Sequence, residues 1–266
     1  MSGSEALVTV DRVNLAFGGV DVLHDVSFTV REQTIASIIG PNGAGKTSLL
    51  NCLSGIYRPG SGSIQLAGEE ITHLAQHRIA RLGLTRTFQT PALFPGLSVV
   101  ENLMVGRYAR NSSGVLSCMV GLPGIRREER RNRAHAESLM ELLQVSHLRR
   151  APVTDLAYGM QKRVELGRAL AQEPRVLLLD EPMAGMTLEE KEDMCALLLT
   201  ARSEFGITTI LVEHDMGVVM DLSDEVVVLN FGKKLVSGPA TVVKNDPAVV
   251  AAYLGSTTDS PKGLVS

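Results

Sequence analysis

The first part of the chain shows the hydrophobic pattern of β-strands. Apolar and polar residues alternate over residues 6–15 and 22–30, as they do in strands that bury only one face. Residues Ile35–Ile39 are almost continuously apolar, which is typical of a parallel strand buried on both faces. Two further short segments, residues 63–66 and 84–88, are also predicted to be strands.

The pattern changes near Pro91, is helical from Leu97 to about Leu148, and returns to alternating strands and helices after Met160. An amphipathic helix is predicted over residues 126–143, with the apolar side chains of Ala134, Leu139, Met140, Leu142 and Leu143 on one side. Later segments are predicted as strands at 176–179, Thr208–Val212, 225–229 and 234–236, with helices between them, one of which begins near Leu188. Such alternation indicates a parallel α/β core. We expect a core formed by residues 1–92 and 161–255, an inserted helical subdomain at 93–160 and a flexible tail at 256–266.

The composition argues against a nucleic-acid partner. The chain has 266 residues, a formal net charge of −3 and 4% aromatic residues, with no Trp, so neither a basic field nor a stacking surface for single strands is indicated. The basic residues between 126 and 133 alternate with Glu128 and Glu129, a pattern that favours a solvated helix face.

Cysteine spacing and hydropathy indicate an intracellular protein that needs a partner to act at a membrane. Cys52, Cys118 and Cys195 lie far apart and suggest neither a metal site nor a disulfide framework. The N-terminus lacks the pattern of a secretory signal. No run of roughly 18 apolar residues is present, so any membrane role is expected to come through another subunit.

A glycine-rich loop between the strand at Ile35–Ile39 and a predicted helix matches the phosphate-binding pattern G-x-x-x-x-G-K-S/T. Backbone N–H groups of such a loop surround phosphate oxygens, and the helix N-terminus adds a favourable dipole. We expect Lys46 to reach the β- and γ-phosphates and the Thr47 hydroxyl to bind Mg²⁺. The predicted nucleotide-binding residues are Gly40, Pro41, Asn42, Gly43, Ala44, Gly45, Lys46, Thr47 and Ser48.

Two adjacent carboxylates end the predicted strand at 176–179. At the carboxyl end of a parallel strand, Asp180 and Glu181 would lie beside the phosphate loop. Asp180 is expected to help hold Mg²⁺, and Glu181 to polarise the attacking water as a general base. His214 follows another buried strand, and Gln89 ends the strand before the helical region, where its amide could bind Mg²⁺ or water. We predict catalytic roles for Glu181, His214, Gln89 and Lys46.

Together these motifs resemble the ATP-binding cassette (ABC) ATPases, over about residues 6–255. The glycine-rich loop matches Walker A, Gln89 the Q-loop, Val176–Asp180 Walker B and His214 the switch histidine, while Phe17 matches the aromatic residue that stacks on adenine. The turn and helix start before Walker B match the signature, formed by Leu156, Ala157, Tyr158, Gly159 and Met160. The resemblance implies a P-loop NTPase (RecA-like) α/β core with an N-terminal antiparallel β subdomain and an inserted α-helical subdomain.

The resemblance also implies partners. Two such subunits, identical or related, would form a head-to-tail dimer in which the signature of one completes the ATP site of the other. Local features such as the segment from Val212 to Met216 are similar to the branched-chain amino acid (Liv-type) importer subunits. The implied protein is a peripheral ATPase at the cytoplasmic face of the inner membrane. It would act with integral-membrane permeases and, indirectly, an extracytoplasmic solute-binding protein.

Three residues depart from the family pattern. Ala157 stands where the signature usually has Ser, Met160 where it usually has Gln, and Thr187 where the D-loop usually has Asp or Asn. Ala157 removes a hydroxyl donor to the γ-phosphate of the partner's ATP, and from Ala157 together with Thr187 we expect that site to be weakened.

Other functions stay open at this stage. The ATPase could serve another ABC system for urea, amides or lipids, or it could be a soluble ABC protein without a transport role. A P-loop kinase or GTPase is disfavoured because the Asn-Lys-x-Asp base-reading motif is missing.

Overall fold

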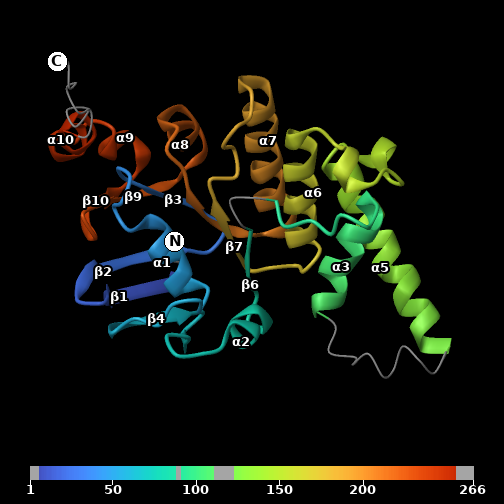
Figure 1. Ribbon diagram of the computed structural model, residues 1–266, viewed down its shortest axis with the longest axis horizontal. Coiled ribbons are helices and arrows are strands. Elements are labelled where there is room, and N and C mark those ends of the chain that lie inside the picture. Colours follow the sequence, from blue (N-terminus) through green and yellow to red (C-terminus); the bar gives the residue numbers. More distant parts are fainter. Residues whose placement is uncertain (1–5, 88–90, 111–122, 256–266) are drawn as a thin grey trace, which may run out of the picture. The chain divides into compact units, whose positions relative to one another are not determined.

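The computed structural model describes residues 6–87, 91–110 and 123–255 (Figure 1). These residues fall into two compact units. The first unit contains the residues up to Gln76 and those from Thr209 onward, and the second contains His77 to Thr208. We describe each unit separately.

An antiparallel sheet with the strand order β2-β1-β4-β5 forms one part of the first unit. Its strands are β1 (Ala6–Phe17), β2 (Val20–Arg31), β4 (Ser61–Leu66) and β5 (Glu69–Glu70). Gly18 and Gly19 join β1 to β2 with φ values of 55° and 83°, a left-handed conformation that glycine adopts without strain. The predicted alternation is confirmed in part, because Val10, Val13 and Leu15 of β1 are buried between more exposed neighbours, whereas Leu7 and Val8 are both buried.

Strand β3 (Ile35–Ile39) is the central strand of the parallel part of this unit. It pairs in parallel with β8 (Thr208–Val212) and with β9 (Glu225–Asn230), and β10 (Lys233–Gly238) adds an antiparallel edge. All five residues of β3 are buried, as its apolar sequence predicts. The helices of this unit are α1 (Lys46–Leu53), α8 (Met216–Leu222), α9 (Ala240–Val243) and α10 (Pro247–Gly255).

The register of β3 against β8 determines which loops meet at the sheet edge. Ile38 pairs with Val212, so both strands end at the same level and point the same way. The glycine-rich loop and His214 therefore leave the sheet side by side, as expected at the carboxyl edge of parallel strands.

The second unit combines a short parallel strand pair with a set of helices. Strand β6 (Leu84–Arg86) pairs with β7 (Val176–Asp180). The helices are α2 (Gln76–Arg81), α3 (Val99–Arg110), α5 (Pro123–Leu142), α6 (Tyr158–Leu170) and α7 (Leu188–Phe205), with 3-10 turns at Ser146–Leu148 and Val153–Asp155. Helices α3 and α6 approach closely at Gly106, where a Cβ atom would lie 2.2 Å from the carbonyl oxygen of Arg168.

The predicted apolar side of α5 needs one correction. Ala134 is exposed, whereas Ala136 and Asn132 are buried. Asn132 lies on the buried face because its side-chain oxygen accepts a hydrogen bond from Arg107 Nε of α3, at 3.1 Å, so a polar contact replaces part of the apolar stripe.

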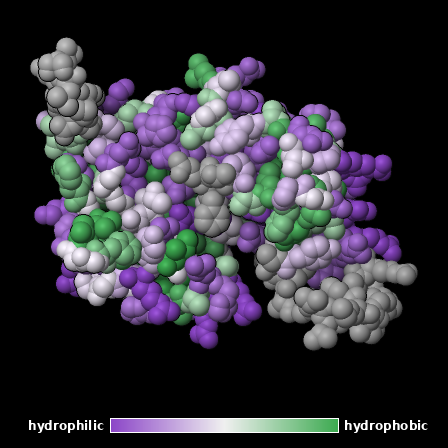
Figure 2. All heavy atoms as spheres, viewed as in Figure 1, coloured by the Kyte–Doolittle hydropathy of each residue, from purple (hydrophilic) through white to green (hydrophobic). Residues whose placement is uncertain are grey.

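The opposite face of α5 is solvated, as its charge pattern predicts. Arg130, Arg131 and Arg133 are exposed beside Glu128 and Glu129, and Figure 2 shows hydrophilic residues gathered over this helix. None of the helices within the described ranges is long and apolar enough to cross a membrane.

Candidate nucleotide-binding site

The glycine-rich loop leaves β3 and leads directly into α1. Gly40 has φ 151°, and a Cβ atom there would lie 2.1 Å from the carbonyl oxygen of Leu229, so only glycine fits against β9. Gly43 and Gly45 also have positive φ, and a Cβ atom at Gly43 would meet nothing within 4 Å. The loop is thus fixed to the sheet at one end and open at its middle.

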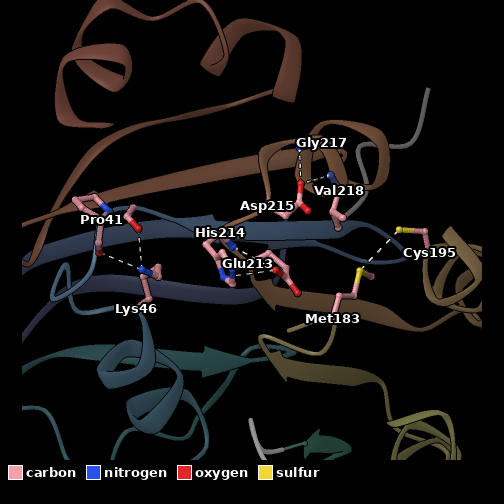
Figure 3. Close-up of polar contacts among 10 residues, drawn as sticks. Pro41, Lys46, Met183, Cys195, Glu213, His214, Asp215, Gly217 and Val218 are labelled. Atoms are coloured by element: carbon pink, nitrogen blue, oxygen red, sulfur yellow. Dashed lines mark hydrogen bonds and ion pairs between the residues drawn. The ribbon is translucent and has the colours of Figure 1, made fainter. Parts of the chain in front are cut away.

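Lys46, the first residue of α1, points back into the loop. Its Nζ donates hydrogen bonds to the carbonyl oxygens of Gly40, at 2.7 Å, and Pro41, at 3.0 Å (Figure 3). The residue is only 8% exposed, so its charge is held against the loop. Thr47 is exposed and Ser48 partly buried, which leaves the Thr47 hydroxyl accessible at the helix N-terminus.

Phe17, at the end of β1, is supported by an aromatic residue that the sequence analysis did not identify. Its ring is 4.9 Å from that of Tyr57, centroid to centroid, with an angle of 72° between the planes. The backbone N–H of Tyr57 donates to the carbonyl oxygen of Asn51 of α1, at 3.0 Å. Phe17 remains 46% exposed, so part of its ring is accessible for stacking beside the contact with Tyr57.

His214 lies between a buried carboxylate and a capped helix. Its Nδ1 atom is 3.9 Å from Oε2 of Glu213, whose side chain is 1% exposed, whereas the His214 side chain is 60% exposed. Asp215 accepts hydrogen bonds from the backbone N–H groups of Gly217 and Val218 at the start of α8 (Figure 3). The backbone is therefore fixed on both sides of the histidine, while its ring faces solvent.

A cavity of about 700 Å³ brings the loop and His214 together. Its lining includes Gly40, Pro41, Asn42, His214, Phe231 and Tyr253. Tyr253 comes from α10, and its pKa is raised by burial, an effect that the nearby backbone of Gly40 opposes. The C-terminal helix thus contributes to the surroundings of the phosphate loop, which no sequence motif indicated.

In the second unit, Asp180 ends β7 as predicted and forms a buried ion pair. Its Oδ2 lies 2.9 Å from Nη2 of Arg86 at the end of β6, and both side chains are 7% exposed. The next residue, Glu181, has φ 48°. A non-glycine residue held in this region commonly costs about 1–3 kcal/mol, and such residues cluster at functional sites.

The signature residues form the start of α6. Leu156 is buried, and Ala157 is an exposed N-cap without a side-chain cap hydrogen bond. Partial burial raises the pKa of the Tyr158 hydroxyl, and the charge of Glu165 adds to the shift. Gly159 is buried, and a Cβ atom there would lie 2.3 Å from Oε1 of Glu190. Met160 is partly buried.

Thr187 has a structural role that its sequence position did not reveal. It is the N-cap of α7 and forms a capping box with Glu190, in which each side chain accepts from the other's backbone N–H. The position treated as a departure in the D-loop therefore carries a residue well suited to start this helix.

The predicted site residues are thus divided between the units. Phe17, the glycine-rich loop and His214 belong to the first, and the last two meet at one cavity. Asp180, Glu181 and the signature belong to the second. Gln89 lies outside the described residues.

Comparison with known proteins agrees with these motifs. The family model for ABC transporters matches residues 23–184. The chain is 40% identical over 252 residues to the high-affinity branched-chain amino acid transport ATP-binding protein BraF of Pseudomonas aeruginosa, covering 95% of this chain and 99% of the relative. It is 36% identical over 252 residues to the corresponding protein LivG of Escherichia coli, with the same coverage.

A solved structure supports the fold. The ADP conformation of MJ1267, an ATP-binding cassette of an ABC transporter, matches with a TM-score of 0.83 and 30% identity, covering 94% of this chain and 99% of that one. The chain therefore belongs to the ABC transporter family, as an ATP-binding subunit with the fold of the ABC ATPases.

Proposed function

We propose that this subunit binds and hydrolyses Mg²⁺·ATP to energise the import of branched-chain amino acids or closely related solutes. The observation that carries the proposal is the 40% identity along nearly the whole chain to a branched-chain amino acid transport ATP-binding protein. The complete phosphate loop and the acidic end of β7 supply the residues that this activity requires.

In the proposed reaction, the phosphate loop positions ATP and Lys46 faces the β- and γ-phosphates. Phe17, backed by Tyr57, would stack on the adenine ring. Glu181 would accept a proton from the attacking water, and His214 would contact the γ-phosphate from the end of β8.

The residues assigned to Mg²⁺ suit a hard cation. The Thr47 hydroxyl is exposed and Asp180 offers a carboxylate, and oxygen ligands of these kinds are the ones that Mg²⁺ prefers. When bound, Mg²⁺ would neutralise charge that develops on the phosphates. Gln89 is proposed as a further oxygen ligand.

We propose that two subunits, identical or related, face each other head to tail. The N-terminus of α6, with Ala157, Tyr158 and Gly159, would then point at the γ-phosphate bound by the partner. The helix dipole and the backbone N–H groups favour this contact even where Ala157 lacks a hydroxyl.

Residues 90–105 are the proposed contact with integral-membrane permeases. Phe94 is 47% exposed and lies close to Ala92, whose backbone is bound by two side chains of α6. Glu165 accepts a hydrogen bond from the N–H of Ala92, and Arg168 donates one to the carbonyl oxygen of Ala92. The Arg168 guanidinium also lies over the Phe94 ring, at 5.7 Å.

This double contact supports a role for α6 in coupling. Both backbone polar groups of Ala92 are held by residues of the helix that begins with the signature. Movement of a permease against Phe94 would thus be passed to the signature helix, and closure of the ATP site would be passed back. In this arrangement the subunit is peripheral at the cytoplasmic membrane face, and an extracytoplasmic binding protein delivers the solute.

Co-expression with integral-membrane permease subunits of a branched-chain amino acid importer would test the proposal. We expect a detergent-stable complex whose ATP hydrolysis and leucine uptake in vesicles both disappear with Glu181→Gln. Uptake of urea, an amide or a lipid instead of leucine would show that the transported solute differs from the one proposed. A subunit that binds RNA and never joins a permease would overturn the transport function.

A further inference from the structure

The buried ion pair between Arg86 and Asp180 has no counterpart among the motifs that define the site. Arg86 ends β6, and its backbone position pairs with Leu178 of β7. The N–H of Thr87 donates to the carbonyl oxygen of Leu178, at 3.0 Å, which fixes the end of β6 to β7. From this position the guanidinium reaches two residues along the neighbouring strand to the carboxylate of Asp180.

The ion pair between Arg86 and Asp180 is both close and buried. The Nη2–Oδ2 distance is 2.9 Å, and each side chain is only 7% exposed. Solvent screens such a pair far less than a surface pair. Removing one partner of a buried ion pair strongly destabilises the folded protein, because the other charge is left buried without a counter-charge. Arg86 thus neutralises the carboxylate that the proposed function assigns to Mg²⁺.

We propose that Arg86 is a positioning residue that competes with Mg²⁺ for the charge of Asp180. The guanidinium holds one carboxylate oxygen, so the carboxylate is fixed before metal arrives and its other oxygen would be left to bind Mg²⁺. Because two cations then share one carboxylate, binding of Mg²⁺ weakens the ion pair, and by reciprocity the ion pair weakens binding of Mg²⁺. Arg86 would in this way ease release of Mg²⁺·nucleotide after hydrolysis.

The proposed role of Arg86 rests on the proposed binding of Mg²⁺·ATP, and it predicts a result that a purely structural role of Arg86 would not produce. If Arg86 merely supported the fold, its removal would lower stability equally with and without Mg²⁺·nucleotide. If it competes with the metal, removal should harm the metal-free protein more, since Mg²⁺ can replace the lost counter-charge.

The test compares Arg86→Met with wild type by thermal unfolding and by ATP binding, each in EDTA and in Mg²⁺. Breaking the pair should lower the midpoint in EDTA by about 10 °C, and Mg²⁺·ATP should restore a large part of this loss. The ratio of ATP affinity in Mg²⁺ to that in EDTA should rise about tenfold over wild type. Equal loss of stability in both conditions, with an unchanged affinity ratio, would overturn the proposal.

Two further variants keep the result interpretable. Arg107→Met removes another ion pair of the same unit, in which Nη1 lies 2.6 Å from Oε1 of Glu173, together with the hydrogen bond to Asn132. These contacts involve no predicted metal ligand, so the variant should lower stability equally with and without Mg²⁺·ATP. Arg86→Lys retains the charge but not the planar guanidinium, so the affinity ratio should stay near that of wild type.

A wild-type protein that binds no ATP would reject the proposed function itself. The ion pair is then still measurable in EDTA from a double-mutant cycle of Arg86→Met and Asp180→Asn. Additive effects of the two substitutions on stability would show that Arg86 and Asp180 do not interact energetically, which would overturn the proposal as well.

Discussion

Replacement of Ala157 by Ser tests what the signature lacks. Ala157 is the N-cap of α6, with φ −57° and ψ 150° and no side-chain cap hydrogen bond. Its carbonyl oxygen already accepts from the N–H of Gln161, at 3.0 Å, so the backbone has the geometry of an N-cap. The residue is exposed, and a hydroxyl can be added without displacing a neighbour.

Two effects are expected from Ala157→Ser, and they are measured separately. The hydroxyl can accept a hydrogen bond from the N–H of Gly159 or Met160, which should stabilise the protein by about 1 kcal/mol and raise its unfolding midpoint by about 2–4 °C. Its proton is then free for the γ-phosphate on the partner subunit. A hydrogen bond to a charged group contributes about 1.5–3 kcal/mol, so ATP hydrolysis by the assembled dimer should rise roughly 10- to 100-fold.

Ala157→Asp is the matched control for this substitution. A carboxylate caps a helix N-terminus at least as well as a hydroxyl, but it has no proton to donate and repels phosphate. We expect both variants to gain stability and only the Ser variant to gain activity. A Ser variant that gains stability while its hydrolysis rate and ATP affinity stay at the wild-type level would refute the idea that the signature is weakened by Ala157.

Three other predictions follow from the same structure. Glu181→Gln should leave equilibrium binding of a fluorescent ATP analogue unchanged and slow hydrolysis by at least about 100-fold; a residual rate near wild type would assign the base to another group. Thr187→Ala should cost about 1 kcal/mol in denaturant unfolding, because the capping box of α7 is lost, whereas Thr187→Asp should cost little. Burial raises the pKa of Cys52 to about 12 from 9.0, so iodoacetamide at pH 8 should label partly buried Cys195 before Cys52. Early labelling of Cys52 in the native protein would contradict its burial. Because the Cys52 thiolate forms more readily in the unfolded chain, the contribution of Cys52 to the free energy of unfolding should fall as the pH rises from about 9 to 12.

Local sequence patterns were sufficient for most of the elements. The buried strand at Ile35–Ile39 and the strand at Thr208–Val212 were predicted with the bounds that the structure shows, because β-branched apolar runs between turn residues have few other solutions. The start of α7 at Leu188 was also predicted correctly. These features depend on residues close together in the chain.

Contacts between distant residues could not be predicted in this way. Tyr57 beside Phe17, Arg86 beside Asp180 and buried Asn132 beside Arg107 each join side chains from separate elements. A Tyr after a helix or an Arg at a strand end resembles an ordinary surface residue. Only the pairing of β6 with β7 indicates that Arg86 can reach the carboxylate of Asp180.

The structure also changes how the departures from the family pattern are interpreted. Glu190 lies against the position that a side chain at Gly159 would need, and the same carboxylate accepts a hydrogen bond from the N–H of Thr187. The signature and the D-loop position are thus joined through one side chain, which is oriented by the cap of α7. Because Thr187 orients Glu190 and Glu190 packs on the signature backbone, Thr187 supports the segment in which Ala157 lacks a hydroxyl. The effect of Thr187 on the signature therefore runs through Glu190 to the backbone at Gly159, two residues after Ala157.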